Sequence, residues 1–123
     1  MTDKFSKWMF LIAGIYGILV LVPQYFLKTQ FGIDNPPAIT HPEFYYGFVG
    51  LALVWQIVFI IISTNPAKYR VLMITAVMEK FFFVAAVGYL YLNEGMNESI
   101  LAGATIDLIL GIGFIVAYFR TKL

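Results

Sequence analysis

Apolar residues follow one another along this chain in four long runs, and short polar segments separate them. Each run meets the length of roughly 20 apolar residues that an α-helix needs to cross a hydrocarbon core of roughly 30 Å. The sequence therefore predicts an all-α fold, an antiparallel four-helix transmembrane bundle that forms one domain. The predicted helices cover residues 8–27, 44–62, 71–92 and 100–119.

The polar segments carry residues that start and stop helices. Thr40 and Glu43 have the spacing of a capping box at the start of the second helix. The pair Asn65-Pro66 favours an interfacial turn before the third helix, and Asn97 or Ser99 can cap the fourth. The longest connection, residues 28–43, contains aromatic and proline residues and predicts an ordered flap over the outer surface. The residues behind that prediction are Phe31, Pro36 and Pro37.

The composition supports a membrane protein and excludes several other classes. The chain of 123 residues is 61% hydrophobic and 12% charged, whereas an ordinary soluble domain is roughly 25% charged. A net charge of +1 argues against a nucleic-acid partner. No cysteine and a single histidine exclude disulfides, thiolate metal sites and multi-histidine metal centres. We therefore expect the lipid bilayer as the main partner, and no metal site or cofactor.

Basic residues are distributed unequally between the two sides of the predicted bundle. The side that holds both termini carries six of them, and the other side carries only Lys28. Basic residues concentrate in cytoplasmic segments, so the N and C termini are predicted to be cytoplasmic. The expected location is the cell (inner) membrane, as a multi-pass protein. The six basic residues are Lys4, Lys7, Lys68, Arg70, Arg120 and Lys122.

Three ionisable residues fall near the middle of the predicted membrane spans. Glu79 and Lys80 lie on the third helix and Asp107 lies on the fourth, and a charge at that depth costs a few kcal/mol unless it finds a partner. The predicted depths of Glu79 and Asp107 differ by roughly 6 Å, a distance that a lysine stem can bridge. Gln56 falls at about the same level as Glu79. The cluster, with net charge −1 if all three groups ionise, is either a salt bridge that fixes helix order or a ligand, proton or ion site.

A second group of candidate residues lies at the predicted outer mouth. His41 and Glu43 could act as acid and base or hold a cation, although Glu43 also belongs to the predicted capping box. Tyr45, Tyr46 and Tyr89 supply amphipathic walls beside them.

Pro23 can kink the first helix and open a gap above the core. The sequence thus predicts an outward-facing or laterally open cavity. Its predicted lining is Tyr45, Phe48, Phe83 and Tyr89, with Asp107, Lys80 and Glu79 at its floor.

Glycines recur at helix-packing spacing in all four predicted spans. Gly103, Asp107 and Gly111 stand four residues apart and so share one helix face. Small residues let helix backbones approach closely in lipid, within a bundle or between protomers, and a chain this short could also work as a homo-oligomer. The alternative is a groove left open for a ligand. Further expected close-approach points are Gly14, Gly17, Gly47, Gly50 and Gly88.

Three segments carry a family resemblance. Residues 41–56 (HPEFYYGFVGLALVWQ), 76–83 (AVMEKFFF) and 106–121 (IDLILGIGFIVAYFRT) resemble a group of small, uncharacterised bacterial four-helix integral membrane proteins. In size and four-span layout the chain is also remotely similar to DoxX-like membrane proteins. The resemblance implies the helical layout and carries no particular activity.

Three classes of function remain open from the sequence. The buried polar cluster favours a protein that binds or carries a small hydrophobic or amphipathic molecule. The glycine faces would instead suit an accessory or assembly subunit that docks a partner membrane protein. The third class is a membrane enzyme with Glu79 or Asp107 as its acid/base.

Overall fold

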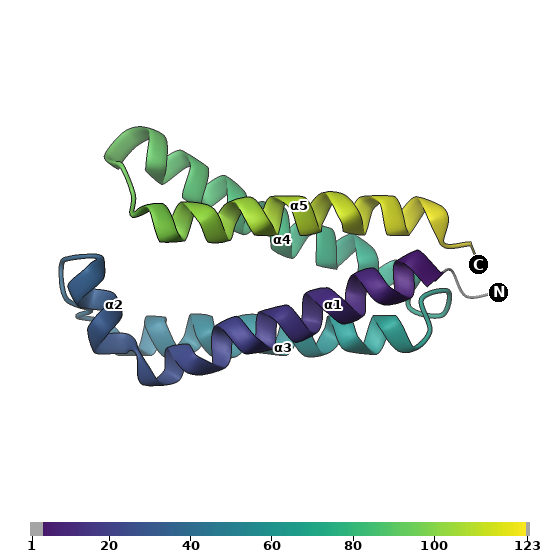
Figure 1. The fold of residues 1–123 in the computed structure, drawn as a ribbon, viewed down its shortest axis with the longest axis horizontal. Helices are drawn as coiled ribbons and strands as arrows, with labels where there is room; N and C mark the ends of the chain where they lie inside the picture. Colours follow the sequence, from purple (N-terminus) through teal and green to yellow (C-terminus); the bar gives the residue numbers. More distant parts are fainter. Residues whose placement is uncertain (1–3, 123) are drawn as a thin grey trace.

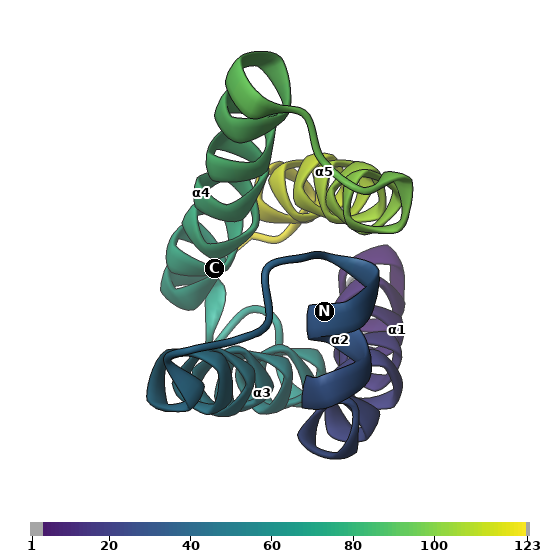
Figure 2. The same cartoon turned by 90° about the vertical axis from the view of Figure 1, so that its left-hand side faces the viewer.

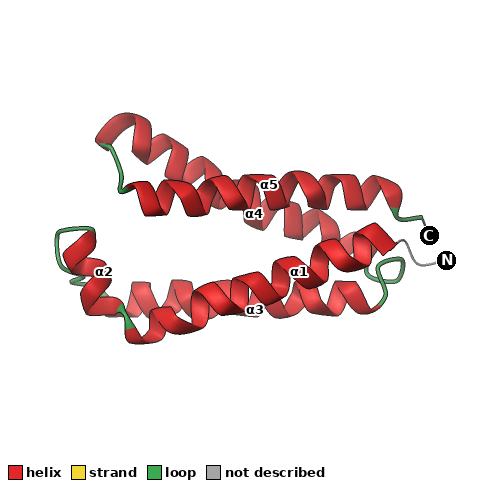
Figure 3. Ribbon diagram, viewed as in Figure 1, coloured by secondary structure: helices red, strands yellow, loops and turns green. Residues whose placement is uncertain are grey.

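The computed structural model describes residues 4–122. In this part of the chain every regular element is a helix, and four of the helices are long and apolar enough to cross a membrane. The prediction of an all-α, four-span fold is confirmed (Figure 3). In chain order the elements are α1 (Lys4–Leu21), the 3-10 helix η1 (Val22–Phe26), α2 (Lys28–Asp34), α3 (Pro42–Thr64), α4 (Arg70–Glu94) and α5 (Glu98–Arg120).

The long helices are arranged as two antiparallel hairpins (Figure 1). Helix α1 packs along α3, and α4 packs along α5. The hairpins meet mainly through α1 and α5, and less through α3 and α4. Both ends of the described chain lie at one end of the bundle, whereas α2 lies at the other. Figure 2 looks onto that second end and shows α2 in front of the bundle, beside α1 and α3.

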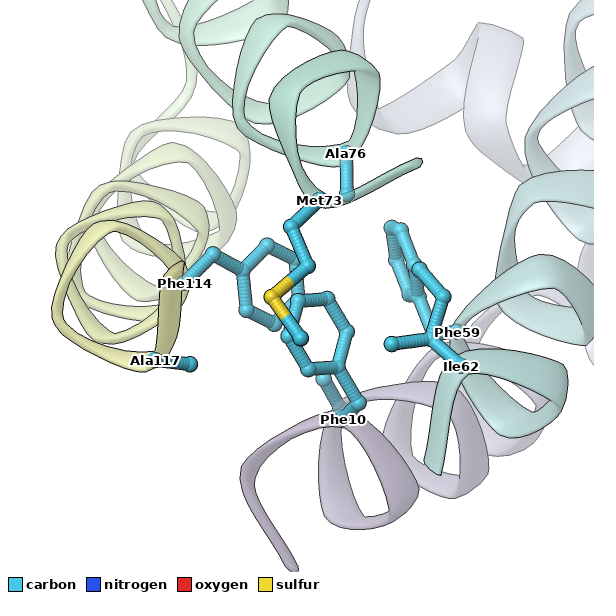
Figure 4. Packing of buried hydrophobic residues seen from close by; sticks show 8 residues of the cluster. Phe10, Phe59, Ile62, Met73, Ala76, Phe114 and Ala117 are labelled. Atoms are coloured by element: carbon cyan, nitrogen blue, oxygen red, sulfur yellow. The ribbon is translucent and has the colours of Figure 1, made fainter. Parts of the chain in front are cut away.

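The hairpins are joined by an aromatic core near the termini. The rings of Phe10 and Phe114 stack with centroids 4.2 Å apart, and Phe59 meets Phe114 edge-on at 4.9 Å (Figure 4). Since lipid tails are as apolar as these side chains, the gain here is close dispersion contact and not removal of water. Fully buried residues complete the core: Ala13, Ile62, Met73, Ala76 and Ala117.

Polar contacts reinforce the same end. Arg70 Nε donates to the carbonyl oxygens of Tyr118 (3.1 Å) and Thr121 (2.7 Å), and its guanidinium lies 3.8 Å from the Tyr118 ring centroid. The Ser6 hydroxyl donates to the Ala117 carbonyl and lies 2.7 Å from the Thr121 hydroxyl. The Arg70 contacts satisfy two carbonyls at the C-terminus of α5, whereas the Ala117 carbonyl also accepts from the Thr121 amide at 2.9 Å. Hydrogen bonds therefore join the start of α1 and the start of α4 to the end of α5.

Most of the predicted helix limits agree with the structure. Helices α3, α4 and α5 begin and end within two residues of the predicted limits. The limits of the first helix are wrong: α1 begins at Lys4 and ends at Leu21, and the chain continues as η1, which contains Pro23. Proline has no N–H to donate and clashes with the preceding turn, so a regular α-helix does not continue through it.

The predicted capping box before α3 is wrong. His41 is the N-cap residue, Pro42 occupies the first helical position, and no side chain caps the helix. Glu43 is therefore one position too early to reach back to the N-cap amide, and its carboxylate lies 3.3 Å from Nδ1 of His41 instead. At the start of α5 the prediction is confirmed, since Asn97 accepts a hydrogen bond from the Ser99 amide at 2.8 Å.

The flap predicted for residues 28–43 is ordered and contains the short helix α2. A helix of seven residues is unstable by itself, so α2 depends on its neighbours. Phe31 packs against the Tyr45 ring with centroids 5.7 Å apart, and Gln30 donates to Asp34 Oδ1 at 2.9 Å. Gly32 is buried against Ala38, where a Cβ would lie 3.2 Å from the Ala38 Cα. The local sequence does not predict this helix, because its support comes from distant residues.

Candidate functional site

A cavity separates the two hairpins at the end opposite the aromatic core. It has a volume of about 860 Å³ and is bordered by all four long helices and by α2. Small-molecule sites in proteins commonly measure roughly 300–1,000 Å³. Helices α3 and α4 belong to different hairpins, have few contacts with each other and both border the cavity. Its walls are largely apolar and include Leu21, Phe48, Leu51, Phe83 and Ile100.

The floor of this cavity is formed by the ionisable residues predicted at membrane depth. Lys80 is only 3% exposed, and its Nζ donates to Asp107 Oδ1 at 3.1 Å and lies 3.8 Å from Glu79 Oε2. The same Nζ lies 5.2 Å from the ring centroid of Phe59, which belongs to the aromatic core. The expected bridge between the third and fourth spans is therefore present. It lies at the boundary between the packed end of the bundle and the cavity.

Two acceptor atoms in this region have no hydrogen-bond donor. Within the described residues, Gln56 Oε1 and Glu79 Oε2 are the buried side-chain atoms without a hydrogen-bond partner, and both residues border the cavity. The Gln56 amide nitrogen donates to the Ala52 carbonyl at 2.9 Å, which holds the side chain in place. A buried polar atom without a partner costs about 1–3 kcal/mol. The floor therefore has unused capacity to accept hydrogen bonds.

The glycines divide into close-approach points and open positions. A Cβ on Gly14 or Gly17 would lie under 3.0 Å from α3, and one on Gly111 would lie 2.8 Å from the Phe81 ring. These three glycines serve helix packing, as expected. By contrast, a Cβ on Gly103 would meet nothing within 4 Å, and this residue borders the cavity. A Cβ added to Gly50 would lie 3.2 Å from the Tyr25 hydroxyl.

Gly47 and Gly88 make no close approach within the bundle, and the alternative of packing between protomers stays a prediction for them. A Cβ at either position would meet no atom within 4 Å, and neither residue borders the cavity. Sequence spacing alone does not distinguish a packed helix face from an outward one.

Of the five residues predicted at the outer mouth, Tyr45 borders the cavity. Its hydroxyl donates to the Gln24 carbonyl at 2.7 Å and so joins α3 to η1. Tyr46 stacks on Tyr25 outside the cavity, with ring centroids 6.1 Å apart. Tyr89 was expected in the lining, but it is 69% exposed on the outer surface of α4.

His41 and Glu43 pair with each other away from the cavity. Their side chains are 69% and 66% exposed, and neither borders the cavity. The structure does not bring this pair together with the cluster formed by Glu79, Lys80 and Asp107.

Several residues of the cavity were not anticipated. Tyr16 and Trp55 border it from α1 and α3, and α2 contributes Gln30, Phe31 and Asp34 at its mouth. The α2 residues were missed because the helix itself was not predicted. Asn97 Nδ2 donates to the Asp34 carbonyl at 3.2 Å, so the start of α5 is linked to the end of α2 across the mouth.

The cavity thus combines a polar floor with largely apolar walls. Among residues 4–122 there is no group of three or more His, Cys, Asp or Glu side chains placed to hold a metal ion. No protein-family model, no curated protein and no solved structure matches this chain.

Proposed function

We propose that the protein binds a small hydrophobic or amphipathic molecule within the bilayer and holds or carries it between its two hairpins. The observation that carries this proposal is the cavity of about 860 Å³ that reaches the ion pair between buried Lys80 and half-buried Asp107. If this ion pair served only to fix the order of the helices, we would expect the hairpins to pack against each other above it.

An amphipathic molecule fits the division of the cavity into walls and floor. Side chains such as Phe48, Leu51 and Phe83 offer contacts to an apolar body. The polar end of the same molecule would reach Gln56 and Glu79, which retain acceptor atoms without donors. Hydrogen bonds formed there would offset the cost of leaving those atoms unpaired.

We also propose that both termini face the cytoplasm of a bacterial cell and that the cavity opens toward the opposite face of the inner membrane. The distribution of basic residues supports this orientation. It is consistent with the bundle, in which both ends of the described chain lie away from α2 (Figure 1).

The proposal can be tested with a substitution that fills the cavity. Gly103→Leu would place a side chain in open space within it, whereas Gly47→Leu would place the same side chain at an open position outside it. Each protein would be purified in mild detergent, and the retained small molecules would be extracted and identified by mass spectrometry. We expect the wild type and Gly47→Leu to retain one apolar species in stoichiometric amount, and Gly103→Leu to lose it.

Equal retention by all three proteins would contradict binding in the cavity. Retention of no species by the wild type, together with a stoichiometric partner protein, would point to an assembly subunit. Conversion of added lipid by the wild type, abolished in Glu79→Gln or Asp107→Asn, would point to an enzyme.

A further inference from the structure

We propose that the molecule held in the cavity is an amphipathic amine, whose cationic nitrogen binds between Glu79 and Gln56. This inference rests on the proposed function and specifies the chemical class of the ligand. It follows from the charge, the hydrogen-bond groups and the aromatic side chains at the cavity floor.

The charges at the floor are unequally paired. Among residues 4–122, Lys80 is the one basic residue that borders the cavity, and its Nζ is closer to Asp107 (3.1 Å) than to Glu79 (3.8 Å). Asp107 thus accepts the hydrogen bond from Lys80. Glu79, whose side chain is only 18% exposed, is then the acidic group without a cation of its own. A buried charge is stabilised by an opposite charge, so the surplus here favours a cation.

The unpaired hydrogen-bond groups have the same preference. Gln56 Oε1 and Glu79 Oε2 are acceptors without donors, and Gln56 is 2% exposed. An ammonium group has several N–H donors and so can offer more than one hydrogen bond to such acceptors, whereas a hydroxyl has one donor. A carboxylate would bring further acceptors and a second negative charge next to Glu79. The floor therefore selects a donor-rich, positively charged group.

Two aromatic side chains that can attract a cation also border the cavity. Trp55 is next to Gln56 in α3, and Tyr16 is next to Gly17, against which Gln56 packs. Faces of tryptophan and tyrosine rings attract cations electrostatically. The apolar body of the amine would extend from this region toward Phe48 and Leu51, where the walls are apolar.

The chain provides a local reporter for a binding experiment. It has two tryptophans, and Trp55 borders the cavity whereas Trp8 is 53% exposed and lies outside it. In a Trp8→Phe background, Trp55 fluorescence reports on the cavity alone. The protein would be placed in nanodiscs of zwitterionic lipid, and quenching would be measured with three bromophenylalkyl probes of equal chain length: an amine, an alcohol and a carboxylic acid.

We expect the amine to bind at least about tenfold more tightly than the alcohol, and the acid to bind most weakly. Glu79→Gln should remove most of the preference for the amine over the alcohol. Glu43→Gln, which removes an exposed carboxylate outside the cavity, should leave that preference unchanged. Gln56→Met, which removes an unpaired acceptor without changing charge, should reduce binding of the amine.

The outcomes separate the inference from the proposed function. Binding of the alcohol or the acid as tightly as the amine would overturn the amine and leave a cavity that binds amphipathic molecules. Quenching by none of the three probes, in a wild type that also retains no apolar species on purification, would overturn both. The comparison of three probes on the Trp8→Phe protein tests the preference for the amine even if a variant at the cavity floor fails to fold.

Discussion

Gly17 and Gln56 are packed so closely that a Cβ added to Gly17 would lie 1.9 Å from Oε1 of Gln56. Two further side-chain atoms of Gln56 would lie within 2.6 Å of that Cβ, so a change of one terminal torsion does not relieve the clash. The glycine in α1 therefore determines where the amide of α3 can lie at the cavity floor.

Gly17→Ala should lower the stability of the bundle, because the Gln56 side chain or helix α1 must move. Overpacking of a filled interior costs about 1–3 kcal/mol. Thermal unfolding in detergent measures the loss. Gly47→Ala is the control, since its Cβ meets nothing within 4 Å. In Gly17→Ala/Gln56→Ala the clash is absent, so most of the loss should be recovered. A double variant less stable than both single variants would show that the two residues do not conflict.

Lys80→Met should destabilise the bundle by leaving the half-buried Asp107 without its cation. Breaking a buried pair costs about 3–5 kcal/mol in soluble proteins, and polar contacts between membrane helices are weaker. Adding Asp107→Asn should restore more stability than adding Glu79→Gln, because the Lys80–Asp107 distance is the shorter one. Unfolding temperatures of the two double variants test this order. Lys68→Met, at an exposed position in the α3–α4 turn, is the control. Strictly additive losses would mean that Lys80 is not coupled to either acid.

Orientation in the membrane can be tested by cysteine labelling, since the chain has no native cysteine. Thr40→Cys and Glu94→Cys should react with a membrane-impermeant maleimide in intact cells. Lys68→Cys and Lys122→Cys should react only after lysis. All four side chains are exposed, so burial does not confuse the result. Labelling at residue 68 from outside would reverse the proposed topology.

Asn97→Asp should loosen α2 while keeping the start of α5 capped. Aspartate retains an acceptor for the Ser99 amide but has no N–H to donate to the Asp34 carbonyl. We expect faster hydrogen exchange of the α2 amides, corresponding to about 1 kcal/mol. Asn93→Asp removes a donor within α4 instead and should leave α2 unchanged. Equal exchange in both variants would show that the Asn97 contact does not hold α2.

The four spans could be predicted because length and apolar composition are local properties. The Lys80–Asp107 contact could also be predicted, since a charge at membrane depth needs a partner and the depth of each residue follows from its position along its helix. Asn97 could be predicted as a cap because its partner, the Ser99 amide, is only two residues away in the sequence.

What could not be predicted depends on orientation around helix axes and on distant contacts. Tyr89 and Tyr45 look alike in the sequence, yet one faces outward and the other borders the cavity. Gly47 and Gly17 likewise differ only in the face they occupy. Helix α2 could not be predicted from its local sequence, because a helix of seven residues is stable only with tertiary contacts such as the packing of Phe31 on Tyr45.

The separation of Lys80 and Asp107 along the chain has a consequence for biosynthesis. The two residues are 27 positions apart, so Lys80 emerges from the ribosome 27 residues ahead of its partner. An unpaired lysine at the centre of a span is costly in lipid. Helices α4 and α5 are therefore expected to leave the translocon together, as a preassembled hairpin. Helices α1 and α3 have no charged residue in the middle of their spans, and each can partition into lipid as it emerges.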